Sequence, residues 1–182
     1  MNVPFVLPVV SVMLAEGERL DPVEDALNEM LGPVELRSDP YPFDLSDYYR
    51  PEMGEGIRRI WLCFGRLRDP SELPGWKLGS AMLEEGFSSG GCRRINLDPG
   101  YLDHGKLVLA SFKEAPDKIY IGSGVWAHTC LRYRFSGFTA PDHSFPDFRD
   151  GRFDAFMLQA RGVYRTLLKD LRKTAISPSA GT

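Results

Sequence analysis

The feature that most constrains the fold is the apolar run from Leu7 to Ala15, which contains no charged side chain. A valine-rich run of this length is typical of a β-strand that is buried on both faces. Such a strand needs neighbouring strands on both edges and side chains above and below it. The rest of the chain must therefore supply both partner strands and covering elements.

The segments that follow alternate between helical and extended patterns. An amphipathic helix begins at Asp21-Pro22 and ends at Gly32-Pro33. Four further elements are predicted in the order edge strand, buried strand, helix and strand, at Val34 to Arg37, Ile57 to Gly65, Lys77 to Phe87 and Arg93 to Tyr101. With the first strand and helix, this order is that of a ferredoxin-like split βαβ unit.

The C-terminal half predicts an extension of this unit. Gly122-Ser123-Gly124 lies between two extended runs and indicates a β-hairpin. The last predicted element is an amphipathic helix with an apolar stripe from Phe153 to Leu171. The segment from Lys106 to Lys113 fits either a strand or a helix, and its local pattern does not decide between them.

These patterns predict one α+β domain over residues 1–173 with an antiparallel or mixed sheet. Its core would be a ferredoxin-like βαββαβ unit, extended by the hairpin and the C-terminal helix. The alternative is an α/β fold in which more of the connections are parallel crossovers. Residues 174–182 consist mainly of Ser, Pro, Gly, Ala and Thr, and we expect them to form a disordered tail.

The composition narrows the class of protein. A chain of 182 residues, 43% of them hydrophobic, can bury a core without disulfides or metals. Its net charge of −3 argues against general affinity for DNA, because binding the nucleic-acid backbone requires a strongly basic surface. The three cysteines are widely spaced, which indicates reduced thiols. With no basic leader and no membrane-length apolar span, we expect a cytoplasmic protein without a membrane partner.

Familiar catalytic motifs are absent from the sequence. The chain has no phosphate-binding P-loop, no dinucleotide-binding glycine motif, no H-E-x-x-H motif and no nucleophile elbow. Its histidines, His104, His128 and His143, are scattered, so we do not expect them to form a metal site. The sequence leaves open whether the protein is an enzyme.

Two segments concentrate polar and aromatic side chains that could form a site. In the strand from Arg93 to Tyr101, alternation predicts a polar face made by Arg94, Asn96 and Asp98, with Arg93 on the opposite face.

The second segment, from Asp39 to Gly54, is a long loop rich in proline, aromatic and acidic residues. Loops of this length in a compact domain are usually functional or disordered, and its aromatic content argues against disorder. We therefore predict that the loop packs over the strand, with Asp44 and Tyr48 close to Arg94 and Asp98.

The same segments resemble a known family. The motifs that support the likeness are Tyr41-Pro42-Phe43-Asp44, Asp47-Tyr48-Tyr49, Glu52-Met53-Gly54, Arg94-x-Asn96-Leu97-Asp98-Pro99-Gly100-Tyr101 and Lys106-Leu107-Val108-Leu109-Ala110. They are similar to those of a bacterial and archaeal family called domain of unknown function 4416, and the likeness covers nearly the whole chain. That family has no established activity, so the resemblance implies a domain boundary and no mechanism.

These observations lead to a binding hypothesis. We expect a small anionic ligand, such as a nucleotide or another phosphate ester, between the Arg93–Tyr101 strand and the Asp39–Gly54 loop. A guanidinium and an ammonium group would hold the anion and an amide would orient it. The predicted ligand-binding residues are Asp44, Tyr48, Tyr49, Arg94, Asn96, Asp98, Tyr101 and Lys113.

Chemistry at this site would depend on its carboxylates. Asp98 and Asp44 are the candidates for a general base, and the same pair could hold Mg²⁺ as a cofactor, since this ion prefers oxygen ligands. No other metal site is predicted.

Two alternatives stay open at this point. In one, Arg94 pairs with Asp98 or Asp44 in an internal salt-bridge network that locks the loop onto the sheet. In the other, a non-enzymatic module docks a protein or RNA partner on the same face. A ligand pocket requires Arg94, Asn96, Asp98 and Lys113 to converge on one concave space, whereas a docking module needs an open, flat patch.

Overall fold

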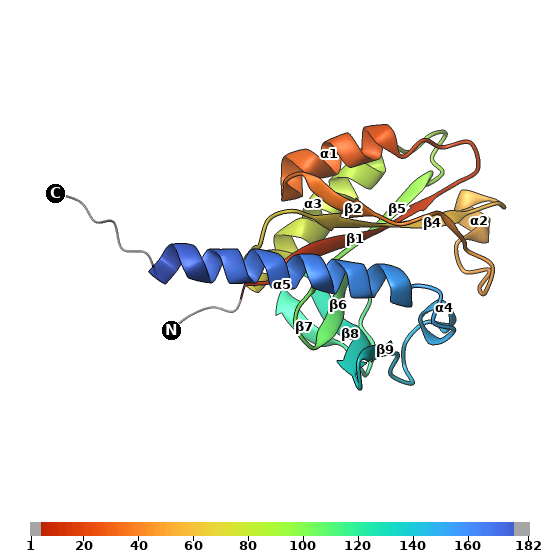
Figure 1. Ribbon diagram of the computed structural model, residues 1–182. Helices are drawn as coiled ribbons and strands as arrows, with labels where there is room; N and C mark the ends of the chain where they lie inside the picture. Colours follow the sequence, from red (N-terminus) through yellow and green to blue (C-terminus); the bar gives the residue numbers. More distant parts are fainter. Residues whose placement is uncertain (1–4, 177–182) are drawn as a thin grey trace.

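The computed structural model describes residues 5–176, which form one nine-stranded sheet with helices on both faces (Figure 1). Every strand pairing in this part of the chain is antiparallel. The main path through the sheet runs β2-β4-β1-β5-β6-β8-β7, with β3 paired to β4 and β9 paired to β8. The predicted α+β class is therefore confirmed, and the parallel pairing of the alternative is absent from residues 5–176.

The first half of the chain forms two interleaved βαβ units. They comprise β1 (Leu7–Leu14), α1 (Asp21–Leu31), β2 (Val34–Arg37), β4 (Arg58–Phe64), the short helix η1 (Pro70–Glu72), α3 (Leu73–Gly86) and β5 (Ile95–Leu102). β1 lies between β4 and β5 and is buried along its whole length. The apolar run is thus a central strand, and β2 is an edge strand beside β4, as both patterns predicted.

The second half of the chain widens the sheet beyond β5. It adds β6 (Lys106–Ser111), β7 (Ile119–Gly122), β8 (Val125–Arg134) and β9 (Gly137–Thr139). The undecided segment after Lys106 is a strand because it pairs with β5 on one edge and β8 on the other. The predicted hairpin joins β7 to β8, and Ser123 in its turn adopts a positive φ of 54°.

Two apolar layers cover the two faces of the sheet. On one face, α1 and α3 pack over alternate residues of β1, β4 and β5, including Val10, Leu62 and Leu97. On the other face, α5 (Asp154–Ile176) packs over the intervening residues, including Val9 and Cys63. Burial on both faces explains why β1 and β4 contain long apolar runs.

The C-terminal helix is longer than its apolar stripe predicted. α5 includes residues 174–176, which were expected to belong to the tail, while the remaining tail residues 177–182 lie outside the described residues. Among residues 5–176, none of the helices combines the length and the apolar content that crossing a membrane requires.

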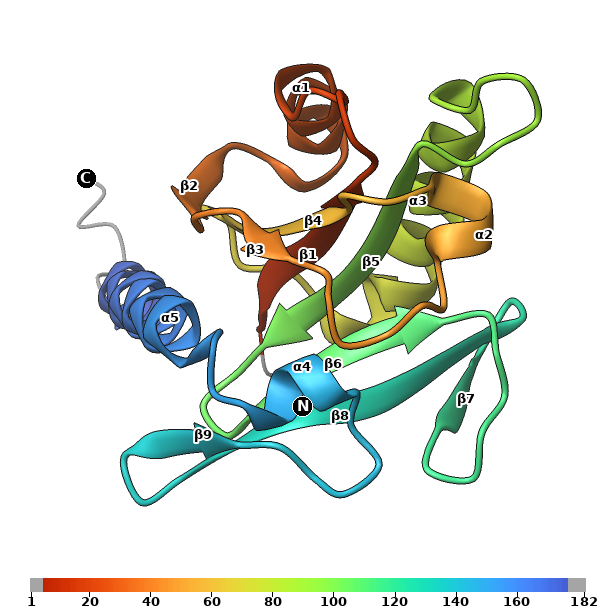
Figure 2. The same cartoon turned by 90° about the vertical axis from the view of Figure 1, so that its right-hand side faces the viewer.

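Three short elements lie in segments that local periodicity did not resolve. β3 (Tyr41–Pro42) and α2 (Arg50–Met53) interrupt the long loop, and α4 (Pro146–Arg149) precedes α5. Figures 1 and 2 show α2 and α4 at the same end of the molecule, where α5 begins. These segments cover the part of the sheet that α5 leaves uncovered.

A glycine determines where β5 and β6 separate. The two strands pair only from Gly100 to Leu102, opposite Leu107 to Leu109. A Cβ atom on Gly100 would lie 2.1 Å from the carbonyl oxygen of Val108, so only glycine permits this approach. Pro99, which precedes Gly100 in the chain, has no N–H with which to continue the hydrogen-bonded ladder. Beyond this point the strands diverge, and the gap between them forms part of the candidate site.

Candidate functional site

A cavity of about 330 Å³ opens beside the α5-covered core, at the end of the sheet where α2 and α4 lie. Five strands contribute to its lining: β4 through Arg59, β1 through Ser11, β5 through Asp98, β6 through Leu109 and β8 through His128. The volume lies within the range of small-molecule binding sites.

Two covering segments close the cavity from above. The loop 38–57 contributes Tyr48, Tyr49 and Glu52, and the segment around α4 contributes Phe145 and Phe148. Tyr48 and Tyr49 pack edge to face, with ring centroids 4.9 Å apart. Burial, together with the nearby Asp98 carboxylate, raises the pKa of the Tyr49 phenol, so this ring stays uncharged at neutral pH.

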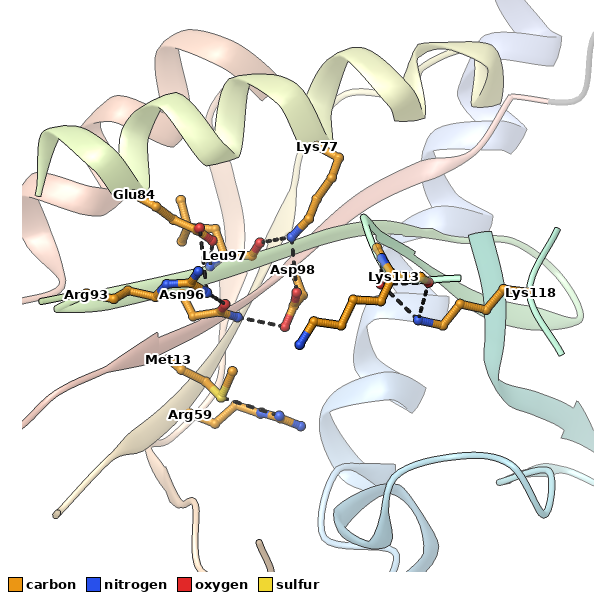
Figure 3. A network of polar contacts seen from close by, with 11 residues as sticks. Met13, Arg59, Lys77, Glu84, Arg93, Asn96, Leu97, Asp98, Lys113 and Lys118 are labelled. Atoms are coloured by element: carbon orange, nitrogen blue, oxygen red, sulfur yellow. Dashed lines mark hydrogen bonds and ion pairs between the residues drawn. The ribbon is translucent and has the colours of Figure 1, made fainter. Parts of the chain in front are cut away.

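Asp98 is at the centre of the polar network (Figure 3). Its Oδ1 lies 3.2 Å from Nζ of Lys77, and its Oδ2 accepts a hydrogen bond of 2.9 Å from Nδ2 of Asn96. Lys77 belongs to α3 on the opposite face of the sheet, and its buried ammonium also donates to the carbonyl oxygen of Leu97 at 2.8 Å. It reaches Asp98 where β5 has separated from β6.

Arg93 extends this network toward the covering loop. Its Nη1 donates to Oδ1 of Asn96 at 2.7 Å, and its Nε lies 3.3 Å from a carboxylate oxygen of Glu52. Glu84 of α3 lies 3.9 Å from the same guanidinium and accepts a hydrogen bond from the Leu97 backbone N–H. Burial raises the pKa of Glu84, although the neighbouring cations oppose that shift.

Arg59 anchors both covering segments. Its guanidinium is almost fully buried and pairs with Asp147 of α4, with 2.5 Å between Nη1 and Oδ2. The rings of Phe43, Phe148 and Phe153 surround it, with centroids 5.2 to 5.7 Å from Cζ. A buried charge needs such a partner, so this ion pair and its aromatic shell hold the cover on the sheet.

Lys113 and Lys118 flank the cavity on the side of β6 and β7. No carboxylate of residues 5–176 lies within ion-pair distance of either ammonium group. Nζ of Lys113 lies 4.2 Å from the ring centroid of Tyr48, and Nζ of Lys118 donates to Oγ of Ser111 at 2.8 Å. Burial lowers the pKa of Lys118.

Two buried polar side chains line the cavity without using their hydrogen-bonding atoms. Within the described chain, neither Oγ of Ser11 nor the ring nitrogens of His128 have a hydrogen-bond partner. Burial, followed by the charge of Lys118, lowers the pKa of His128 to about 4. The Asp98 carboxylate and a polar contact with the Leu109 backbone oppose this shift, and that contact lacks the geometry of a hydrogen bond. His128 is therefore a neutral imidazole at pH 7.

The structure brings together five of the eight residues that the sequence predicted for the site. The cavity is lined by Tyr48, Tyr49, Asn96, Asp98 and Lys113. The predicted proximity of Tyr48 to Asp98, residues 50 positions apart in the chain, is therefore present.

The other three predicted residues lie elsewhere. Nε of Arg94 pairs with Glu18 at 2.8 Å, in the connection between β1 and α1. Tyr101 packs into the core under α1 and α3. Asp44 pairs with Arg152 at 3.0 Å on the outer surface of the loop. The predicted proximity of Asp44 to Arg94 and Asp98 is therefore wrong, as are both proposed pairs of Arg94.

The error over the two arginines has a local cause. The prediction extended strict alternation back to Arg93, but β5 begins only at Ile95. Alternation holds within the strand, where Asn96 and Asp98 line the cavity and Ile95 and Leu97 enter the opposite core. Before the strand begins, it is Arg93 that turns toward the cavity.

Sequence reasoning missed several residues that line the cavity. Two of them gave a detectable signal. Ser11 places a hydroxyl group in a fully buried strand, and Arg59 places a charged side chain in an otherwise apolar strand. Lys77, Lys118 and His128 gave no such signal, since their roles depend on elements that are distant in the chain.

The two predicted catalytic or metal-binding carboxylates are not brought together. Asp44 borders a separate hollow with Asp47 and Arg50, while both oxygens of Asp98 are engaged by Lys77 and Asn96. Residues 5–176 contain no cluster of three or more His, Cys, Asp or Glu side chains that could hold a metal ion.

A larger hollow of about 650 Å³ lies along the C-terminal part of α5. Its lining includes Arg165, Lys169, Arg172 and Lys173, all of which are exposed. Exposed cations on one helix are typical of a solvated surface, whereas the smaller cavity encloses buried polar groups. The smaller cavity is therefore the candidate site.

Comparison with known proteins identifies the family. The model of a family described as domain of unknown function (DUF4416) matches residues 4–164. The chain belongs to this family. The match covers β1 to β9, α4 and the first half of α5, so the whole lining of the cavity lies inside the DUF4416 domain. No curated protein and no solved structure matches the chain.

Proposed function

We propose that the cavity of this DUF4416 protein binds a small anionic ligand. The observation that supports the proposal is the pattern of charge pairing. Five basic and three acidic side chains line the cavity, and all three acids already have basic partners among them. Asp147 neutralises Arg59 from behind the lining. Glu52 and Glu84 share Arg93, so the lining together with Asp147 carries a net charge of +1. Lys113 and Lys118 are the lining cations that have no carboxylate partner within residues 5–176.

Two ammonium groups that lack carboxylate partners within residues 5–176 can each contact an oxygen of a doubly charged anion. A phosphate monoester satisfies both, because it carries nearly two charges at pH 7 and offers three acceptor oxygens. Tyr48 lies over Lys113 and is 56% exposed, so its ring can cover an anion bound there. Asn96 and Asp98 are held in place by Arg93 and Lys77 and can orient the rest of the ligand.

The proposal is tested by thermal unfolding with sodium phosphate and with phosphate esters. A ligand at one hundred times its Kd stabilises the folded state by about 2.7 kcal/mol, which raises the Tm by roughly 5 to 10 °C for a domain of this size. We expect this shift for the wild type and its loss in a Lys113→Ala/Lys118→Ala double variant.

The matched control is Lys169→Ala/Arg172→Ala, which removes two cations from the exposed face of α5. It should keep the full shift. An equal response of the two double variants would show that any binding depends on general surface charge, and the proposal would then be abandoned.

A docking module for RNA is the second candidate, favoured by the exposed ring of Tyr48 beside Lys113. A single-stranded base can stack on such a ring while the ammonium contacts a phosphate. This candidate differs in its salt response, because contacts to several phosphates would weaken binding at least a hundredfold between 50 and 200 mM salt. Fluorescence anisotropy with a labelled oligoribonucleotide measures that slope.

A further inference from the structure

The part of the cavity next to the two lysines contains a second set of recognition groups. We infer that the ligand is a phosphate monoester of an uncharged, planar, hydrogen-bonding group, and that Ser11 and His128 bind this group at the floor of the cavity. The inference rests on the proposed function, because it assumes that Lys113 and Lys118 hold the anion. It adds the chemical class of the remainder of the ligand.

Ser11 supplies the first argument. Its side chain is 1% exposed and its hydroxyl has no partner within residues 5–176. An unsatisfied buried hydroxyl costs about 1 to 3 kcal/mol, and alanine would fit the same position on β1 without that cost. A hydroxyl that lines a cavity and is not used by the protein is placed to bond a ligand.

His128 supplies the second argument. The imidazole is 9% exposed, and within the described residues both its ring nitrogens lack partners. Since the ring is neutral at pH 7, it offers one donor and one acceptor. With the Ser11 hydroxyl, it can bond a group that presents both donors and acceptors, such as a heterocyclic ring.

The charges of the floor argue that this group is neutral. Asp98 is compensated by Lys77, Arg59 by Asp147, and His128 is uncharged. A second ligand charge here would be desolvated without a free counterion, which is costly. Within the described residues, the lining cations without a carboxylate partner are the two lysines of the β6–β7 side.

Aromatic rings argue that the group is planar. The ring centroid of Phe145 lies 6.4 Å from that of His128, and Phe148 lies beside the Arg59 guanidinium. Both phenylalanines line the cavity above the polar floor. A flat ring can contact these faces while its edge bonds the floor, in the way that aromatic side chains recognise bases.

The length of the site excludes a bare anion as its full occupant. Ser11 lies on β1 and His128 on β8, with β5 and β6 between them, and three strand spacings span roughly 14 Å in a flat sheet. An inorganic phosphate on the lysines cannot also reach Ser11 at the β1 end of the floor. A mononucleotide has a phosphate, a spacer and a planar heterocycle, and it is the probe class that fits this arrangement.

The test measures the affinity of four probes by isothermal titration calorimetry. They are inorganic phosphate, ribose 5-phosphate, and the nucleoside monophosphates AMP and CMP. We expect at least one nucleotide to bind ten times more tightly than ribose 5-phosphate. Ser11→Ala and His128→Leu should each weaken that nucleotide about five- to tenfold and leave ribose 5-phosphate unchanged.

A buried serine outside the cavity provides the control. Ser80 of α3 is fully buried and its hydroxyl also lacks a partner in the described part of the chain, but it does not line the cavity. Ser80→Ala should leave the affinity of every probe unchanged. Circular dichroism confirms that each variant is folded before titration.

The outcomes separate this inference from the proposed function. If ribose 5-phosphate binds as tightly as both nucleotides, and only the lysine variants weaken it, the anion site stands and the inference is overturned. If Ser11→Ala and Ser80→Ala weaken the nucleotide equally, the floor does not contact the ligand, and the inference is again overturned. If none of the four probes binds the wild type, the proposed function fails and the inference fails with it.

Discussion

The two halves of one sheet face differ in how they are covered. Under α5, the strands present apolar side chains such as Val9 and Leu107, which pack against Phe156, Met157 and Ala160 of the helix. Two residues further along β1, the same face presents Ser11, and only short elements and loops lie above it.

This difference shows how the cavity is maintained. An apolar stripe on a long helix can close-pack against a sheet, since side chains interdigitate to the density of a crystal. The cover of the polar half is fixed instead by the buried ion pair between Arg59 and Asp147, and it leaves a space of about 330 Å³. Polar side chains and incomplete packing therefore occur together.

Breaking the ion pair between Arg59 and Asp147 should cause the largest loss of stability. Asp147→Ala leaves the Arg59 guanidinium buried without a counterion, so we expect a loss of about 3 to 5 kcal/mol in the free energy of unfolding. Urea denaturation measures it. Asp150→Ala, which removes a more exposed acid after α4, should cost less than about 1 kcal/mol. Equal losses in the two variants would contradict the anchoring role.

Disrupting the close approach of β5 and β6 at Gly100 is the next test. In Gly100→Ala, the new methyl group would meet the carbonyl oxygen of Val108, so the paired strands must move apart. We expect a loss of about 3 kcal/mol, the upper range for overpacking. Gly105→Ala in the turn between the same strands is the control, because its Cβ would meet nothing closer than 3.9 Å. It should stay within about 0.5 kcal/mol of the wild type.

Lowering the pH should reduce the free energy of unfolding through protonation of His128. The pKa of this imidazole is lowered to about 4 in the folded state, from about 6.5 when unfolded. The unfolded state therefore binds the proton first as pH falls, and stability decreases from pH 6.5 down through pH 4. Over that window the wild type should lose up to about 3 kcal/mol more than His128→Gln.

Urea denaturation of both proteins across this pH range measures the effect. Carboxylates titrate in both proteins, so the difference between the two curves of stability against pH isolates the contribution of His128. Parallel curves would show that the imidazole is already charged or solvated in the folded protein.

The smallest expected effect is a difference in stability between alanine variants of two buried serines. Ser38 donates to the Asp39 carbonyl oxygen and accepts a hydrogen bond from the Trp61 N–H, so Ser38→Ala should cost about 1 to 2 kcal/mol. Ser11→Ala removes a hydroxyl without a partner in the described residues, and it should be neutral or stabilising by up to about 1 kcal/mol. Thermal unfolding without ligand distinguishes them. A destabilised Ser11→Ala variant would indicate a structural role for this hydroxyl.

The sequence by itself determined the elements whose period is local. The apolar run of β1, the stripe of α5 and the glycine turn between β7 and β8 each predict one conformation, because helix and strand repeat at different intervals. The predicted proximity of Tyr48 to Asp98 is also observed. It followed from the length and aromatic content of the Asp39–Gly54 loop.

Only the tertiary structure decided the rest of the site. The strand from Lys106 is fixed by its two neighbours, and Arg93 replaces Arg94 because β5 begins after both. Lys77 reaches Asp98 from the far face of the sheet, and Arg59 meets Asp147 across 88 positions of the chain. Such pairings have no local period, since they depend on the path of the chain between the two residues.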